Sequence, residues 1–356
     1  MSVEMLPESV RARIRGARGR GRVGDVGGVD RVDDAGAVGR RVRPGLRLAL
    51  LGALAAAACL FFALYGAWDA WALIGPMRLG RLASLVVVAV AVAVSTVLFQ
   101  TVTDNRILTP SVMGFDALFA FIQTAGIVVL GAGTMAAMPA ATKFGVELGI
   151  MLVASTALFT WILGGAKRSL YLLVLVGIVL GTFIRSISAF LQRIISPDAF
   201  LVLQDALFAS FANVKPELLS IASAIVAACC LFVAVTHRRL DVLALGRATA
   251  VTLGVDHRRW VMVVLAICSL LVSVSTALVG PVTFFGLLVA HIGYQVVVTH
   301  RHAFTVPAAA LVSVITLVGG QAVLEHLFQR ATVLSVVIEF LGGIVFLVLI
   351  VRGGRR

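Results

Sequence analysis

A small set of polar side chains interrupts the long apolar runs of this 356-residue chain. They are Asp116, Gln123, Glu147, Arg185, Gln295, Gln321, Glu325 and Glu339. A charge at the centre of a membrane helix costs roughly 2.5–3.5 kcal/mol, so each such residue suggests a function, and together they could form a proton- or ion-coupling relay. Asp116, Glu147 and Glu325 fall near run ends, and Arg185 and Glu339 lie deeper. Structural pairing or the lining of a cavity is therefore favoured over a relay.

The chain offers no pattern for covalent chemistry. Its 6 His and 4 Cys residues form no H-E-x-x-H or Cys/His cluster, and no G-x-S-x-G presents a nucleophile. No G-x-x-x-x-G-K-[ST] phosphate loop occurs, because "GGAKRS" at 164–169 has the wrong spacing. We expect no catalytic residue, no metal ligand and no cofactor. If transport is driven by ATP, the motor must be another subunit.

The elements that position the polar residues are read from hydropathy. Mean hydropathy is +1.05, and 60% of the residues are hydrophobic. Runs of about 18 or more apolar residues can cross a bilayer as helices. We predict an all-α, polytopic membrane protein with about ten transmembrane helices. The expected spans are 46–66, 82–103, 110–132, 144–164, 169–190, 217–236, 260–279, 281–298, 305–324 and 334–351.

The distribution of basic residues predicts the orientation. An even number of spans puts both termini on one side, and a cytoplasmic N-terminus places most of the 30 Lys and Arg residues in cytoplasmic segments. The basic residues left outside are Arg78, Arg81, Lys143, Arg193, Lys215 and Arg330. We therefore predict that both termini are cytoplasmic. The net charge of +13 then mainly reflects topology, and no nucleic-acid partner is expected.

Residues 1–45 differ from the rest of the chain. Arg, Gly and Asp dominate and no apolar period is present, so we predict a disordered, basic cytoplasmic tail. A G-x-G-x-x-G match at Gly19, Gly21 and Gly24 lacks the flanking strand and helix and is attributed to chance. Binding of RNA or anionic lipid by the arginines is the alternative to a tail without a function.

The longest cytoplasmic connection, "THRRLDVLALGRATAVTLGVDHRRW" at 236–260, has helically spaced apolar residues and two glycines, Gly246 and Gly254. This pattern predicts two short amphipathic helices joined at Gly246. The connection is either a surface hairpin or a docking element, because an apolar face on a solvent-side loop usually contacts a partner.

Two further segments contain helix-start signals. In "TDNRILTPSVMGFDALF" at 103–119, a polar turn at 104–106 precedes Thr109, predicted to cap a helix that starts at Pro110. In "GPVTFFGLLVAHIGYQ" at 280–295, Pro281 is predicted in the first turn of a new helix. The two segments follow the second and seventh spans on opposite faces, which suggests an inverted repeat. "GIVLG" at 177–181 predicts close helix packing.

These segments together resemble the FecCD-type permease subunits of ABC importers for iron–siderophore chelates, haem and cobalamin. "RLGR" at 78–81 is similar to the family's R-L-P-R, and the stretch from Asn105 through Pro110 to Gly114 to its N-x-[L/I]-x-[S/T]-P-x-x-x-G. "LGRATAVTLG" at 245–254 resembles its L-G-x-x-x-A-x-x-L-G, and the stretch from Gly280 to His291 its G-P-[I/V]-x-F-[V/L]-G-L-x-x-P-H. The details are closest to the catecholate-siderophore subgroup, such as petrobactin or enterobactin permeases.

The resemblance implies a permease domain over 46–352 with coupling helices at 240–259. It implies as partners two copies of an ATP-binding subunit, a second permease (a sister chain or a copy), a substrate-binding lipoprotein, membrane lipids and an iron–siderophore substrate. The location would be the cytoplasmic membrane. ATPase coupling would involve Leu245, Gly246, Arg247, Ala250, Leu253 and Gly254, and binding-protein docking Arg78 and Arg81. The translocation path or helix-start motifs would include Asn105, Pro110, Gly114, Asp116, Gly280, Pro281 and Gly286.

The chain departs from the family pattern at four positions, which are Gly80, Arg247, Ala290 and Gln295. These departures leave the role of His291 open. Haem or cobalamin as cargo remains an alternative. An ion-coupled secondary transporter and a membrane-embedded enzyme are the competing classes, and the enzyme lacks any nucleophile or metal constellation.

Overall fold

The computed structural model describes residues 44–65, 71–163, 170–211, 214–326 and 334–353, all within one compact unit, Arg43–Arg356. Every regular element in these ranges is helical, which confirms the all-α prediction. Most of the predicted tail, residues 1–43, lies outside them. The helices are α2 (Pro44–Leu64), α3 (Trp71–Thr103), η3 (Pro110–Met113), α4 (Phe115–Leu130), α5 (Ala132–Ala137), α6 (Ala140–Leu163), α7 (Leu170–Gln192), α8 (Pro197–Leu207), α9 (Pro216–Leu243), α10 (Arg247–Thr252), α11 (His257–Val279), α12 (Phe285–Val297), α13 (His302–His326) and α14 (Leu334–Gly353).

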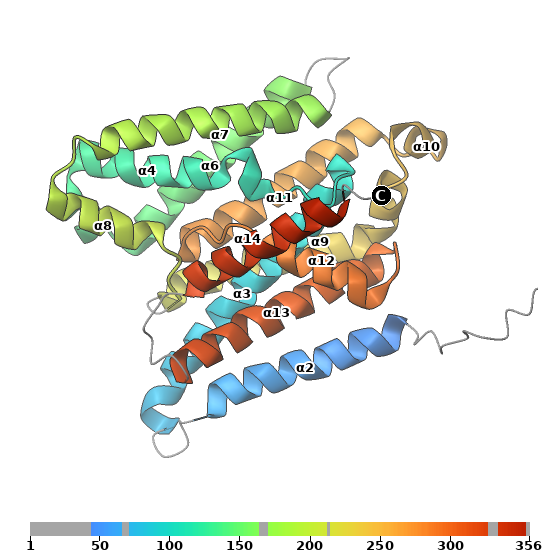
Figure 1. Ribbon diagram of the computed structural model, residues 1–356, viewed down its shortest axis with the longest axis horizontal. Helices are drawn as coiled ribbons and strands as arrows, with labels where there is room; N and C mark the ends of the chain where they lie inside the picture. The colour runs from blue at the N-terminus through green and yellow to red at the C-terminus, as the bar shows by residue number, and fades with distance from the viewer. Residues whose placement is uncertain (1–43, 66–70, 164–169, 212–213, 327–333, 354–356) are drawn as a thin grey trace, which may run out of the picture. The chain divides into compact units, whose positions relative to one another are not determined.

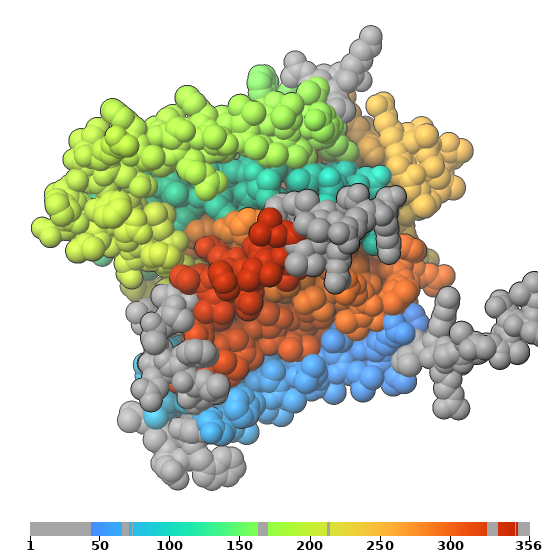
Figure 2. Space-filling view, viewed as in Figure 1, coloured from blue at the N-terminus to red at the C-terminus, as the bar shows by residue number. Residues whose placement is uncertain are grey.

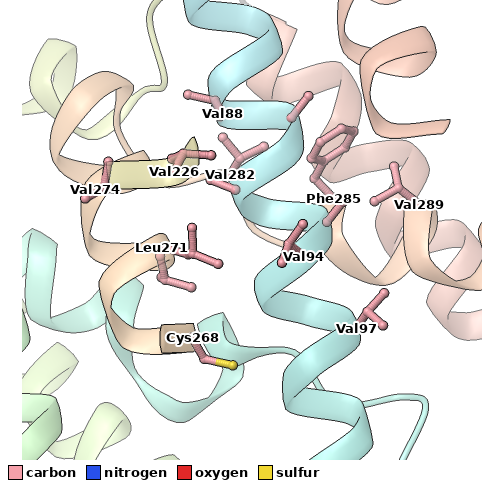
Figure 3. Close-up of a cluster of buried hydrophobic side chains, with 14 of the residues drawn as sticks. Val88, Val94, Val97, Val226, Cys268, Leu271, Val274, Val282, Phe285 and Val289 are labelled. Atoms are coloured by element: carbon pink, nitrogen blue, oxygen red, sulfur yellow. The ribbon is translucent and has the colours of Figure 1, made fainter. Parts of the chain in front are cut away.

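Helices α3 and α11 form the centre of the packing. The most apolar window of each is 67% buried, against 17% for α2 and 22% for α7 and α9. From Leu82 to Val102 helix α3 has no charged residue, and small Ala and Val side chains let α9, α11, α12 and α13 all pack against it. Figure 3 shows Val88 and Val94 of α3 between Leu271 of α11 and Phe285 of α12. The central helices therefore have little freedom to move independently.

Seven helices of the described residues are long and apolar enough to cross a membrane: α2, α3, α6, α7, α9, α11 and α13. The apolar stretches 115–130, 285–297 and 334–345 are shorter. Each of the ten predicted runs coincides with one of these helices or shorter stretches, but the number of spans stays a prediction. The short helices α5 and α8 were not predicted, because neither carries an apolar run of spanning length.

Two predicted helix boundaries are wrong. Helix α12 begins at Phe285, so Pro281 lies outside it, because Gly280 and Phe284 both adopt positive φ angles that delay the helix start. Helix α9 continues to Leu243, well past residue 236. The first of the two short helices predicted around Gly246 is therefore the end of α9, and only α10 is a separate short helix.

Candidate functional site

The chain between α3 and α4 is interrupted by a turn and a short 3-10 helix. Asn105 Oδ1 accepts a hydrogen bond from the Ile107 N–H at 2.9 Å, and Gln100 Nε2 donates to the Arg106 carbonyl at 2.8 Å, which confirms the predicted polar turn. Thr109 precedes Pro110 in extended conformation, as a cap should, but makes no side-chain capping bond. Its hydroxyl is buried and has no partner among the described residues. The predicted cap therefore has the right position without the predicted hydrogen bond.

Gly114 ends this 3-10 helix in left-handed conformation, with φ 96°, against the glycines of α7. A Cβ added to Gly114 would lie 2.8 Å from Gly181 Cα, and one added to Gly177 would lie 3.3 Å from the Met113 carbonyl oxygen. The small-residue spacing of "GIVLG" thus does allow the close packing that the sequence predicted.

This contact gives a stability test. A Gly181→Ala substitution should lower the melting temperature of the purified protein by several degrees, because the new methyl group would overpack the Gly114 backbone at a cost of about 1–3 kcal/mol. The matched control is Gly149→Ala in α6, where an added Cβ meets no atom within 4 Å. Alanine is the better helix former by roughly 1 kcal/mol, so the control should be neutral or stabilising. Equal effects of the two changes would contradict the packing argument.

The chain between α11 and α12 is the second interruption. Gly280 has φ 102°, and a Cβ there would lie 3.1 Å from Ala209 Cα. The Ser210 N–H donates to the Val279 carbonyl at 2.8 Å, so the chain at the end of α11 packs on the segment after α8. Gly286 lies in α12 so close to Thr96 of α3 that an added Cβ would collide with the Thr96 hydroxyl. Gly280 is therefore required for the close approach of two backbone segments, and Gly286 for the close approach of α12 to the side chain of Thr96.

The two interruptions meet at the centre of the helix packing. Thr283 Oγ1 donates a hydrogen bond of 2.8 Å to Asp116 Oδ2, across 167 residues of sequence. Asp116 also interacts electrostatically with Arg185 of α7 and Glu339 of α14, whose side chains are exposed. The sequence identified both segments but did not predict this contact, which we call the central junction (residues 109–116 and 280–286).

A small cavity of about 20 Å³ lies within the central junction, enough for about one water molecule. Hydroxyl groups from α3, η3, α11 and the residue before η3 line it, namely Ser95, Thr96, Thr109, Ser111, Ser275 and Thr276. The unpartnered Thr109 hydroxyl belongs to this set. Polar groups from α3 and α11 thus face the central junction. Helices that are interrupted inside the helix packing are typical of transporter sites.

The predicted coupling segment lies at the surface, at the end of the helices opposite α8 (Figures 1 and 2). Gly246, with φ 85° and ψ 168°, turns the chain from α9 into α10, and Gly254, with φ 78°, turns it towards α11. Ala250 is fully buried, whereas Leu245, Val251 and Leu253 are each more than half exposed. Arg247 is exposed as well. The segment therefore presents an apolar patch that its own helices do not cover.

The two arginines predicted to dock a binding protein have partners within the chain. Arg81 Nη1 forms an ion pair with Glu325 Oε1 at 2.7 Å, and Gln321 donates to the same oxygen at 2.9 Å. Arg78 Nη1 donates to the carbonyls of Phe62 and Tyr65 at the end of α2. Both arginines therefore join the adjoining ends of α2, α3 and α13, and docking stays a prediction.

Other intramembrane polar residues are paired at separate places. Gln123 Nε2 donates to Glu147 Oε1 at 2.7 Å, and Lys143 lies 3.9 Å from the same oxygen. Gln295 Nε2 lies 2.7 Å from His291 Nε2 in α12. The described residues contain no group of three or more His, Cys, Asp and Glu side chains that could hold a metal ion. This separation agrees with structural pairing and not with a continuous relay.

Comparisons with known proteins agree with the helical fold and the motifs. The profile of the FecCD transport family matches residues 47–352. The petrobactin import system permease protein YclO of Bacillus subtilis is 40% identical over 316 residues, covering 88% of this chain and 99% of that protein. The petrobactin import system permease protein FatC of Bacillus anthracis is 34% identical, covering 77% and 78%.

Among solved structures, a metal-chelate type ABC transporter in an inward-facing conformation matches with a TM-score of 0.75. The match covers 86% of this chain and 99% of that one at 21% identity, and it supports the fold. Family profile and relatives together cover nearly all of the described residues, the central junction and the coupling segment included. The chain is therefore a multi-pass protein of the cytoplasmic membrane that belongs to the FecCD transport family.

Proposed function

We propose that the chain is the permease subunit of an ATP-driven importer that carries an iron(III)–siderophore chelate, and that the chelate is ferric petrobactin or a close relative. The observation that carries the proposal is the 40% identity to a petrobactin import permease over 99% of that protein's length. The similarity to a second petrobactin import permease at 34% supports the same cargo.

The proposed assembly has ten spans, with both termini in the cytoplasm and a permease domain over 46–352 that follows a 45-residue basic tail. Importers of this family work with an ATPase subunit and a substrate-binding protein. Two copies of the ATPase would dock on 240–259, and a second permease would complete the path. The lipoprotein would dock near Arg78 and Arg81. The uncovered Leu245, Val251 and Leu253 support docking at the first of these surfaces.

The contacts described above suggest how the chain would pass a conformational change from the ATPase to the central junction. Helix α10 leads through a short turn (253–256) into α11, and α11 ends at Val279, just before Gly280 and the second interruption. Closure of the ATPase would displace α10 and shift α11, which moves Thr283 relative to Asp116 at the central junction. Opening and closing of that junction would expose the path to one face and then to the other. No covalent step occurs on this chain.

Radio-iron uptake tests the proposal. A strain that lacks the gene should regain uptake of ferric petrobactin when the gene is restored, and ATP depletion should stop this uptake. A panel with ferric enterobactin, haem and cobalamin tests the cargo, because relatives at 26% identity include enterobactin, vitamin B12 and hemin permeases. Uptake that survives ATP depletion but collapses with the ion gradient would instead indicate a secondary transporter.

A further inference from the structure

A hydrogen-bonded cluster joins three helices at the base of the coupling segment. It consists of Thr101 of α3, Asp241 of α9 and His302 of α13, and we call it the Asp–His cluster. Asp241 Oδ1 accepts from the His302 backbone N–H at 2.7 Å and lies 2.6 Å from His302 Nδ1. His302 Nε2 lies 2.8 Å from Thr101 Oγ1. One imidazole ring therefore connects the ends of α9 and α3.

The geometry of the cluster leaves no group of the ring unsatisfied. His302 is 5% exposed, so its side chain is almost fully removed from solvent. Nδ1 faces the Asp241 carboxylate, and Nε2 faces the Thr101 hydroxyl, whose single proton goes either to Nε2 or to the Val97 carbonyl. The carboxylate also bonds to the first backbone N–H of α13, where a negative charge is favourable. A charge-assisted arrangement of this kind is stronger than a neutral hydrogen bond.

The position of the cluster gives it a mechanical consequence. Asp241 lies two residues before the end of α9, directly ahead of the turn at Gly246. On the other side of α9, Arg239 lies over the Trp260 ring of α11 at 4.9 Å. The end of α9, which leads into α10, is thus attached to α11 through the Arg239–Trp260 contact. The Asp–His cluster attaches the same end to α3 and α13.

Helix α3 extends this attachment to the central junction. Thr101 is five residues from Thr96, about 7.5 Å along the helix at 1.5 Å per residue. Thr96 lines the small cavity and packs against Gly286. Because α3 is almost wholly buried along this stretch, a displacement at Thr101 is carried along the helix and not absorbed locally.

We propose that Asp241 and His302 are positioning residues that transmit displacement of the coupling segment to α3 and α13. The inference rests on the proposed ATP-driven transport. It assigns a role to His302, which lies outside the docking segment 240–259, and a second role to Asp241 within that segment. If the link is removed, ATP hydrolysis continues, but less of it is converted into transport.

The test uses the complete importer with full-length chain in proteoliposomes and measures two quantities. The first is ferric petrobactin uptake per ATP hydrolysed. The second is the stimulation of ATP hydrolysis by the substrate-binding protein, a measurement that does not require the cargo to be known. Asp241→Ala and His302→Ala should each lower uptake per ATP about tenfold, the factor expected from losing one charge-assisted hydrogen bond. His302 lies outside the docking segment 240–259, so His302→Ala should leave basal hydrolysis nearly unchanged. Asp241→Asn keeps the acceptor oxygen and should retain most of the coupling.

A pair of threonines supplies the matched control. Thr101 Oγ1 and Thr103 Oγ1 both lie 2.8 Å from the carbonyl oxygen four residues earlier, and Thr101 also contacts His302. Thr101→Val should therefore reduce uptake per ATP, and Thr103→Val should not. If Asp241→Ala or His302→Ala fails to assemble, the comparison of Thr101→Val with Thr103→Val decides the question. Unchanged uptake per ATP and unchanged stimulation in Thr101→Val and in the assembled alanine variants would overturn the inference, whereas wild-type protein that carries no ferric petrobactin would reject only the cargo.

Discussion

A Gly246→Leu variant should insert into the membrane at the wild-type level and yet show no uptake. Gly246 has φ 85° and ψ 168°, a region of backbone conformation that is open almost exclusively to glycine, and a side chain there costs about 1–3 kcal/mol. A Cβ added at Gly246 meets nothing within 4 Å, so the first atom of the new side chain does not clash with the fold. The chain will relieve the strain by reorienting α10, which carries the uncovered Leu253 and Val251 surface. Immunoblotting of membranes and radio-iron uptake measure the two parts of the prediction.

Two companion variants separate backbone strain from bulk. Gly246→Ala introduces the same strain with one methyl group and should lose part of the uptake. Gly149→Leu places an equally large side chain in α6, also with nothing within 4 Å of its Cβ, and should transport normally. Co-purification of the ATPase should be lost with Gly246→Leu and kept with Gly149→Leu. Normal uptake by Gly246→Leu would remove the docking role from this segment.

The parts of the fold that could be predicted are those that local chemistry determines. Continuous apolar runs predict helices, because the backbone in lipid must satisfy its own hydrogen bonds. The polar turn at 104–106 and the close packing at Gly177 and Gly181 follow from short-range preferences and were confirmed. The turn at Gly246 was expected from its position between apolar repeats, and its positive φ angle agrees.

The predictions that failed depend on contacts between distant segments. Pro281 favours the first turn of a helix, yet Gly280, which packs against the backbone of Ala209, and Phe284 both adopt positive φ angles, so the helix begins only at Phe285. The bond from Thr283 to Asp116 joins segments whose pairing leaves no signal in one sequence. Asp241 and His302 were missed for the same reason, since each is a single polar residue near the end of an apolar run. Only their approach within 2.6 Å makes them candidates.

Arg81 is predicted to dock a binding protein, but in the structure it forms an ion pair with Glu325. Exchanging the charges of Arg81 and Glu325 separates these two roles. Arg81→Glu alone should strongly reduce the amount of folded protein. It breaks an ion pair whose Glu325 side chain is only 6% exposed, and the loss of one partner of a buried pair costs about 3–5 kcal/mol. The double variant Arg81→Glu, Glu325→Arg restores opposite charges across the same contact. Gln321, which bonds to Glu325, can turn its amide to accept from the new arginine. The melting temperature should therefore return most of the way to the wild-type value.

If the exchanged variant is as stable as the wild type, any remaining functional difference between the two can be assigned to docking of the binding protein. If Arg81 attracts carboxylates of a binding protein, a glutamate at this position repels them, so stimulation of ATP hydrolysis by that protein should stay low although the fold has recovered. Arg193→Glu is the charge-matched control, because Arg193 is exposed and is expected on the same outer side. It should change stimulation little. Full recovery of both stability and stimulation in the exchanged variant would mean that Arg81 acts only through Glu325, by holding the start of α3 against the end of α13.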